Sequence, residues 1–166
     1  MELSSKIHQE LNRQITSELE AWYTYLSLSA FFESKTLLGC ASWMRKQAEE
    51  ELKHAMKIFD YVNQRGGTVK LEALPAPKSE FTSVVAAFEA ALAHEQKNSK
   101  RIEELVELAQ KESDKATLSF LNWFLDEQVE EEDSARKNLE LAKMCGDSSS
   151  ALLQLDFLLG KRKDSD

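Results

Sequence analysis

The chain has 166 residues, of which 42% are hydrophobic and 30% are charged, and its formal net charge is −8. This balance fits a single domain over residues 1–166 with a sizeable core, and it excludes a largely disordered chain. The negative charge argues against nucleic acid or an anionic membrane as a partner, because both are bound through clustered lysine and arginine side chains.

The composition is that of an all-α protein. Helix-forming residues dominate, and the chain holds only five glycines and two prolines. No segment alternates apolar and polar residues as a half-buried strand would, and no apolar stretch approaches the roughly 20 residues of a membrane span. No leader-like segment precedes a cleavage motif at the N-terminus. We therefore expect a cytoplasmic protein, although a plastid protein without its transit peptide would look the same.

Two long helices are predicted in the first part of the chain. The first runs from about residue 4 to 33, and the second from about residue 37 to 65, where Gly66 and Gly67 end it. Only the short turn at residues 34–36 separates them. A connection this short makes the two helices antiparallel neighbours.

The next connection, residues 68–81, holds both prolines and is too long for a hairpin. A helix of about 28 residues is roughly 42 Å long, and about 15 extended residues can just cover that distance. We therefore expect the third helix, from residue 82 or 83 to 111, to run parallel to the second. A short turn leads into a fourth helix that ends near Gly146, so the bundle occupies about residues 4–145.

A short apolar helix is predicted at about residues 148–159, where one of three consecutive serines can cap its start. An apolar helix beyond a completed bundle needs another surface to cover it. We expect that surface to be a subunit interface. The alternative is that the helix folds back onto its own bundle.

Each of the four long helices carries an acidic residue in the middle of its apolar face. Removing an ionised carboxylate from water costs several kcal/mol even after relaxation, so four would rival the roughly 5–15 kcal/mol stability of a domain. A bound cation removes this cost for all of them together. At core spacing the four faces read Leu11, Ile15, Glu18, Trp22, Tyr25, Ser29 and Phe32; Met44, Ala48, Glu51, Ala55, Ile58 and Val62; Val85, Phe88, Leu92, Glu95, Ser99, Ile102, Val106 and Ala109; and Leu121, Phe124, Gln128, Glu131, Ala135, Leu139 and Ala142.

These residues are predicted to meet, because each lies near the midpoint of its helix and midpoints share one level in a side-by-side bundle. Glu51 and His54 are three residues apart on one helix face, where both can reach a single ion. An oxygen-rich set with one histidine and no thiolate suits iron or manganese, and Glu51 is best placed to bridge two cations. The predicted pocket contains Glu18, Glu51, His54, Glu95, Gln128 and Glu131.

Over essentially its whole length the chain resembles ferritin. The resemblance rests on the long connection after the second helix, the short fifth helix, and the residues Glu18, Tyr25, Glu51-x-x-His54, Glu95 and Gln128-x-x-Glu131. It implies a ferritin-like four-helix bundle with a long crossover and a short C-terminal fifth helix.

The resemblance also implies roles for individual residues. Glu18, Glu51 and His54 look like the first iron site of a ferroxidase centre. The second site looks like Glu51, Glu95 and Glu131, with Gln128 nearby and Tyr25 beside it. Similarity to bacterial non-haem ferritins suggests a third, inward iron site, although its acidic runs could also be solvated helix faces. That third site would use Glu50, Glu127, Glu130 and Glu131.

Such a protein would take up Fe(II), oxidise it with dioxygen or peroxide, and store ferric mineral inside a cage of 24 identical subunits. Bacterioferritin and rubrerythrin are similar too, but they typically carry a second Glu-x-x-His where this chain has Gln128-x-x-Glu131. Haem is not expected, because Leu52 replaces the methionine through which bacterioferritin binds it. The alternatives are a rubrerythrin-type di-iron oxidase or peroxidase without storage, and a metal-free structural bundle.

Overall fold

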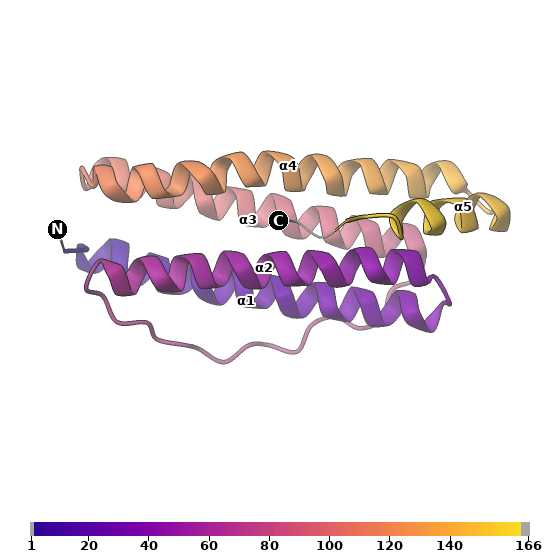
Figure 1. Ribbon diagram of the computed structural model, residues 1–166, viewed down its shortest axis with the longest axis horizontal. Coiled ribbons are helices and arrows are strands. Elements are labelled where there is room, and N and C mark those ends of the chain that lie inside the picture. The colour runs from indigo at the N-terminus through magenta and orange to yellow at the C-terminus, as the bar shows by residue number, and fades with distance from the viewer. Residues whose placement is uncertain (1, 164–166) are drawn as a thin grey trace.

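The computed structural model describes residues 2–163, which form five α-helices and no strand (Figure 1). Four long helices form a bundle and a short fifth helix follows, so the predicted all-α architecture is confirmed. No helix within residues 2–163 combines the length and the apolar character that a bilayer crossing requires. The helices are α1 (Ser5–Ser34), α2 (Leu38–Gln64), α3 (Val84–Lys111), α4 (Lys115–Cys145) and α5 (Ser149–Leu159).

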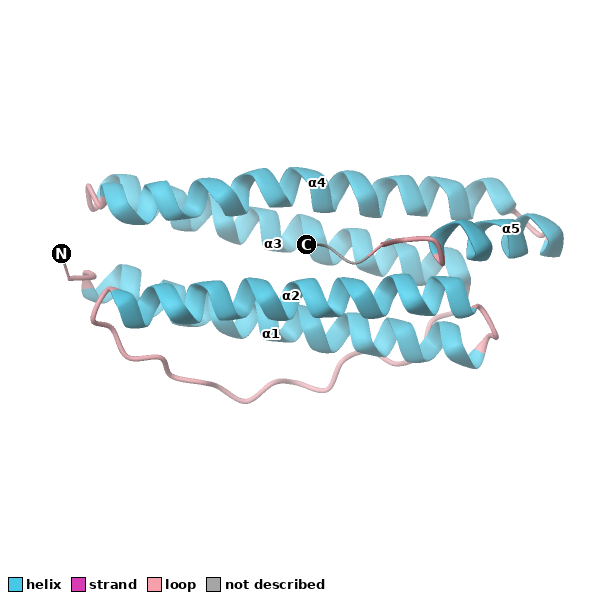
Figure 2. Cartoon of the chain, in the orientation of Figure 1, coloured by secondary structure: helices cyan, strands magenta, loops and turns pink. Residues whose placement is uncertain are grey.

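The connection between α2 and α3 runs along the length of the bundle, so α3 is parallel to α2 as predicted (Figure 2). Side chains of α1 hold it in place. The Asn12 Oδ1 accepts a hydrogen bond from the Lys70 backbone N–H at 2.7 Å, and the Ser27 hydroxyl donates to the Lys78 carbonyl at 2.7 Å. The crossover thereby makes two antiparallel hairpins, α1–α2 and α3–α4, into one bundle.

The core of the bundle is apolar at both ends and polar in the middle. One apolar cluster includes Leu28, Phe32 and Met44, and the other includes Leu11 and Ile58. The polar side chains of the layer between the two clusters are buried as well. The buried polar residues of that layer are Gln14, Glu18, Gln47, Glu51, His54, Glu95, Asn98, Gln128 and Glu131.

The buried face of α3 differs in part from the predicted one. Four predicted positions are only partly buried, namely Val85, Leu92, Ser99 and Val106. The positions that complete the buried face are Ala87, Ala91, Asn98 and Leu105. Three of these, Ala91, Asn98 and Leu105, lie one residue before the predicted positions Leu92, Ser99 and Val106, so this side of the buried face is displaced by one residue from the predicted one. Periodicity shows that a helix has an apolar face, but not where the centre of that face lies.

The short helix α5 packs on its own bundle, against α2 and α4, through the buried side chains of Leu155 and Leu159. The buried face of α5 therefore packs on its own bundle, which was the alternative to the expected subunit interface. The Asp156 carboxylate also accepts a hydrogen bond from the Cys40 backbone N–H at 2.8 Å, in the first turn of α2, where the N-cap Leu37 offers none. The other face of α5 stays exposed in the single chain.

Helices α2 and α5 approach each other closely at Gly39. A Cβ atom there would lie 1.8 Å from the backbone oxygen of Asp156, so α5 would have to move. We predict that Gly39→Ala loosens α5 and destabilises the protein by about 1–3 kcal/mol, the usual cost of overpacking. Helix propensity alone predicts the opposite sign, a stabilisation of about 1 kcal/mol. Amide hydrogen exchange of residues 149–159 measures the effect, and unchanged protection would contradict the prediction.

Candidate metal centre

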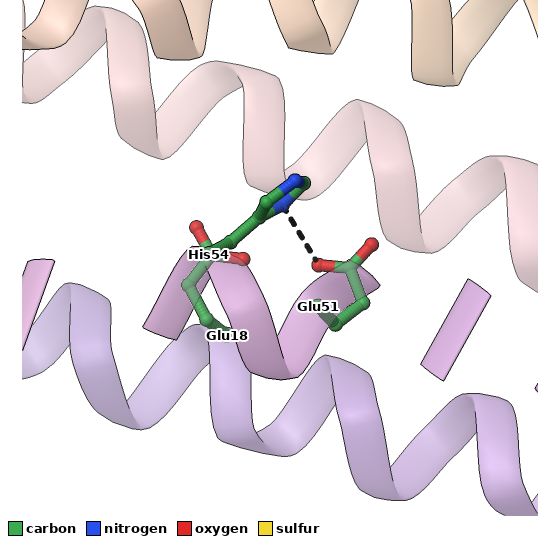
Figure 3. A group of neighbouring side chains, drawn as sticks. All are labelled: Glu18, Glu51 and His54. Carbon is green, nitrogen blue, oxygen red and sulfur yellow. Dashed lines mark ion pairs between the residues drawn. The ribbon is translucent and has the colours of Figure 1, made fainter. Parts of the chain in front are cut away.

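The first group of ligand atoms joins α1 and α2. Glu18 on α1 is fully buried, and Glu51 and His54 on α2 are 1% and 5% exposed. Figure 3 shows the Glu51 carboxylate directed at the His54 imidazole, with Glu18 beside them. One ligand atom from each of the three side chains lies within 4.8 Å of the others. This spacing allows all three to bind one cation.

A second group shares Glu51 with the first. It joins Glu51 to Glu95 on α3 and Glu131 on α4, again with ligand atoms within 4.8 Å of one another. The Gln128 amide donates to the Glu95 carboxylate at 3.4 Å and to the Ser99 hydroxyl at 3.2 Å, so it lies beside this group. A carboxylate common to two ligand sets can bridge two cations.

A third group lies at the edge of the bundle, where a cavity of about 740 Å³ opens. Ligand atoms of His54, Glu127 and Glu131 lie within 4.8 Å of one another here. Glu50 and Glu130, the other residues predicted for an inward third site, also line this cavity. The Glu50 carboxylate forms an ion pair with Arg162.

Two buried atoms of the first group have no hydrogen-bond partner. They are Glu51 Oε2 and His54 Nδ1, which face each other at 3.6 Å, too far for a hydrogen bond. Leaving a buried polar atom unpaired costs about 1–3 kcal/mol. A cation bound to both atoms would remove that cost, so the residues present fit a metal ion.

The remaining oxygens of the acids accept hydrogen bonds from amides that were not predicted from the sequence. Gln14 donates to Glu18 at 2.8 Å, and Gln47 donates to Glu51 at 3.1 Å. Asn98 donates to the other oxygen of Glu18 at 3.2 Å. Both glutamines precede their acid by four residues, one helical turn, so this spacing could have revealed them.

Burial changes the protonation of the acids. Burial first, and then the charge of Glu51, raises the pKa of Glu18 to about 8. Burial and the charge of Glu95 raise the pKa of Glu131 to about 8. The pKa of Glu95 rises only to about 7, because Tyr25 and Gln128 donate hydrogen bonds that oppose the effect of burial. Without a cation, the layer therefore holds protons near neutral pH, which a cation must displace.

Aromatic rings close the layer on two sides. The buried Tyr25 hydroxyl donates to the Glu95 carboxylate, and burial together with the Glu95 charge raises the pKa of Tyr25. The rings of His94 and Tyr25 pack edge-on with their centroids 6.1 Å apart, and the rings of Trp123 and His54 pack edge-on with their centroids 5.3 Å apart.

The chain matches the ferritin-like domain family over residues 8–145. The bacterial non-heme ferritin of Staphylococcus saprophyticus is 42% identical over 160 residues, which cover 96% of each chain, and that of Staphylococcus aureus strain USA300 is 38% identical over the same share. An open pore ferritin from the hyperthermophilic archaeon Archaeoglobus fulgidus is 49% identical, with a TM-score of 0.96 over 97% of this chain and 99% of that one. A humanized archaeal ferritin is 46% identical, with a TM-score of 0.97 over 99% of both chains. On its sequence and its fold alike, this chain belongs to the ferritin family.

Proposed function

We propose that this chain is a ferritin subunit that takes up Fe(II), oxidises it with dioxygen or peroxide, and stores the ferric product as mineral. The observation that carries the proposal is the pair of buried ligand groups that share the Glu51 carboxylate. Iron is the substrate of this site and then the stored material. Membership of the ferritin family supports the same function.

The two ligand groups suit a reaction that needs two electrons. Each Fe(II) gives up one electron on becoming Fe(III), so two adjacent ions can reduce dioxygen to hydrogen peroxide with two protons. Glu18 and His54 would hold one ion, and Glu95 and Glu131 would hold the other. Glu51 would bind both ions. The shielded layer excludes bulk water from the reacting ions, and the carboxylates favour the higher charge of the product.

Product ions would leave through the acidic cavity at the edge of the layer. Glu131 belongs both to the second ligand group and to the third, so it connects the two. We propose that Glu50, Glu127, Glu130 and Glu131 hold a third iron on this route. Burial raises the pKa of Glu127, so a cation that binds this carboxylate must displace a proton at low pH.

A rubrerythrin-type oxidase or peroxidase is the second candidate. It would keep the di-iron pocket but not store iron. The Gln128-x-x-Glu131 sequence on α4 counts against it, as do the relatives of nearly equal length that are named ferritins. We therefore favour storage.

Storage requires a shell, and we propose that identical subunits form it, 24 by resemblance to ferritins. The exposed face of α5 supports association. Leu153 is 63% exposed and Phe157 is 68% exposed, on the side of α5 that faces away from the bundle. Apolar side chains gathered on one helix face are expected to lie against another subunit.

Removing a ligand should abolish rapid iron oxidation. We predict that Glu51→Ala and His54→Ala slow aerobic Fe(II) oxidation by more than the roughly 10–100-fold that loss of an outer-sphere partner typically costs. The assay follows the absorbance of ferric species after Fe(II) addition. Glu49→Ala is the matched control, because Glu49 is an exposed carboxylate on the same helix. Equal rates in all four proteins would refute the assignment of the site.

Metal and pH should act on stability in opposite directions. The folded pKa values of Glu18, Glu95 and Glu131 lie above the ordinary value of 4.5, so their contribution to stability is present below that pH and is lost as pH rises through about 7–8. We predict that the melting temperature of chelator-treated protein decreases as the pH is raised from about 6 to about 9. Added Zn(II) should raise the melting temperature again and release protons. A melting temperature independent of pH and of Zn(II) would contradict this.

The exposed face of α5 can be tested without disturbing its buried face. We predict that the double variant Leu153→Ser/Phe157→Ser lowers the particle mass measured by light scattering, while helix content by circular dichroism stays unchanged. Gln154→Ser is the control, since Gln154 is exposed on the same helix. A parent protein that runs as a monomer would refute the shell itself.

A further inference from the structure

After α5 the chain turns back along the bundle, as Figure 1 shows. Arg162 lies in this returning segment and contacts α2. Its guanidinium pairs with the Glu50 carboxylate, donates to the Gln47 Oε1 at 2.9 Å, and lies 4.5 Å from the centre of the Trp43 ring. Its backbone oxygen accepts a hydrogen bond from the Lys46 ammonium. The returning segment is therefore fixed to α2 at the level of the polar layer.

Gln47 connects this segment to both ligand groups. It is fully buried, and its Nε2 donates to Glu51 Oε1 at 3.1 Å and to Glu131 Oε2 at 2.6 Å. Its Oε1 faces the opposite way, toward Arg162. A single buried amide thus joins the C-terminal segment to the acid shared by both sites and to an acid of the second.

The orientation of this amide depends on Arg162. A guanidinium can only donate hydrogen bonds, and the two carboxylates, which are ionised when they bind a cation, can only accept them. The Gln47 amide satisfies both neighbours in one orientation alone, with its oxygen toward Arg162 and its NH₂ group toward the acids. If the amide turned over, its oxygen would face two carboxylates, which repel it.

We propose that Arg162 is a positioning residue of the metal centre, which acts through Gln47 to hold Glu51 and Glu131 in their cation-binding orientation. The inference rests on the proposed function. Gln47 engages one oxygen of Glu51 and leaves the other, Oε2, as the unpartnered atom that faces His54. The C-terminal segment therefore helps to select which carboxylate oxygen remains for a cation.

A purely structural role for Arg162 would be to fasten the tail through Glu50 and Trp43. The two roles differ in what a variant changes. Loss of a fastening loosens α5 and the segment after it, with no specific effect on cation affinity once α5 is docked. Loss of positioning weakens cation binding, and it does so only while the Gln47 amide is present.

The test is an anaerobic titration with Co(II), a redox-stable probe, followed by its visible absorption, which reports ligand geometry as well as affinity. The variants are Arg162→Gln, Gln47→Met and the double variant. Lys161→Gln is the matched control, because it removes a neighbouring positive charge that lies over Phe157 and not over Gln47. Hydrogen exchange of α5 and light scattering monitor tail docking and assembly in each protein.

We expect Arg162→Gln and Gln47→Met each to weaken Co(II) binding about tenfold and to alter the Co(II) spectrum, as loss of an outer-sphere partner does. The double variant should bind no more weakly than Gln47→Met alone, since both changes remove the same interaction. Lys161→Gln should match the parent protein.

Several results would overturn the inference while leaving the proposed function intact. They are parent-like Co(II) binding by Arg162→Gln, parent-like binding by Gln47→Met with α5 docked, an equal loss in Lys161→Gln, and additive losses in the double variant. A parent protein that takes up no Co(II) at the buried groups would instead overturn the proposed function.

Discussion

The structure depends on one electrostatic constraint, which is that several carboxylates are buried close together in the middle of the bundle. Burial and mutual repulsion both disfavour their charged forms, which is why the pKa values of Glu18 and Glu131 rise to about 8. Amide and hydroxyl donors offset part of this cost, but Glu51 Oε2 and His54 Nδ1 stay without partners. A cation bound between these two atoms would give both of them a partner.

The rest of the fold keeps that layer in place. Apolar clusters on either side hold the four helices together, so the polar layer does not have to contribute to stability by itself. Two hairpins and one long crossover bring acids from α1, α2, α3 and α4 to the same height. The amides of Gln14, Gln47 and Asn98 then orient the acids, and Gln47 extends the layer to the C-terminal segment. The polar layer is therefore a connected network of hydrogen bonds that extends as far as Arg162.

Much of this could be predicted from the sequence. Helical periodicity with an acid inside each apolar face indicated both the bundle and the acids of the polar layer, because such positions are costly unless something compensates them. The two glutamines one turn before Glu18 and Glu51 carried a readable signal as well. Val85 and Leu92, predicted to lie on the buried face of α3, are only partly buried although they pack against the core, because periodicity does not show where the centre of an apolar face lies.

Local spacing and the lengths of the connections were enough to establish the helices, their order, and the axial position of each acid. The folded bundle was needed to show that α5 folds onto α2 through the backbone contact at Gly39, and that Arg162 reaches Gln47. Those contacts join residues more than a hundred positions apart, and no local pattern encodes them. They arise because a packed bundle offers a particular surface, which exists only once the helices have assembled.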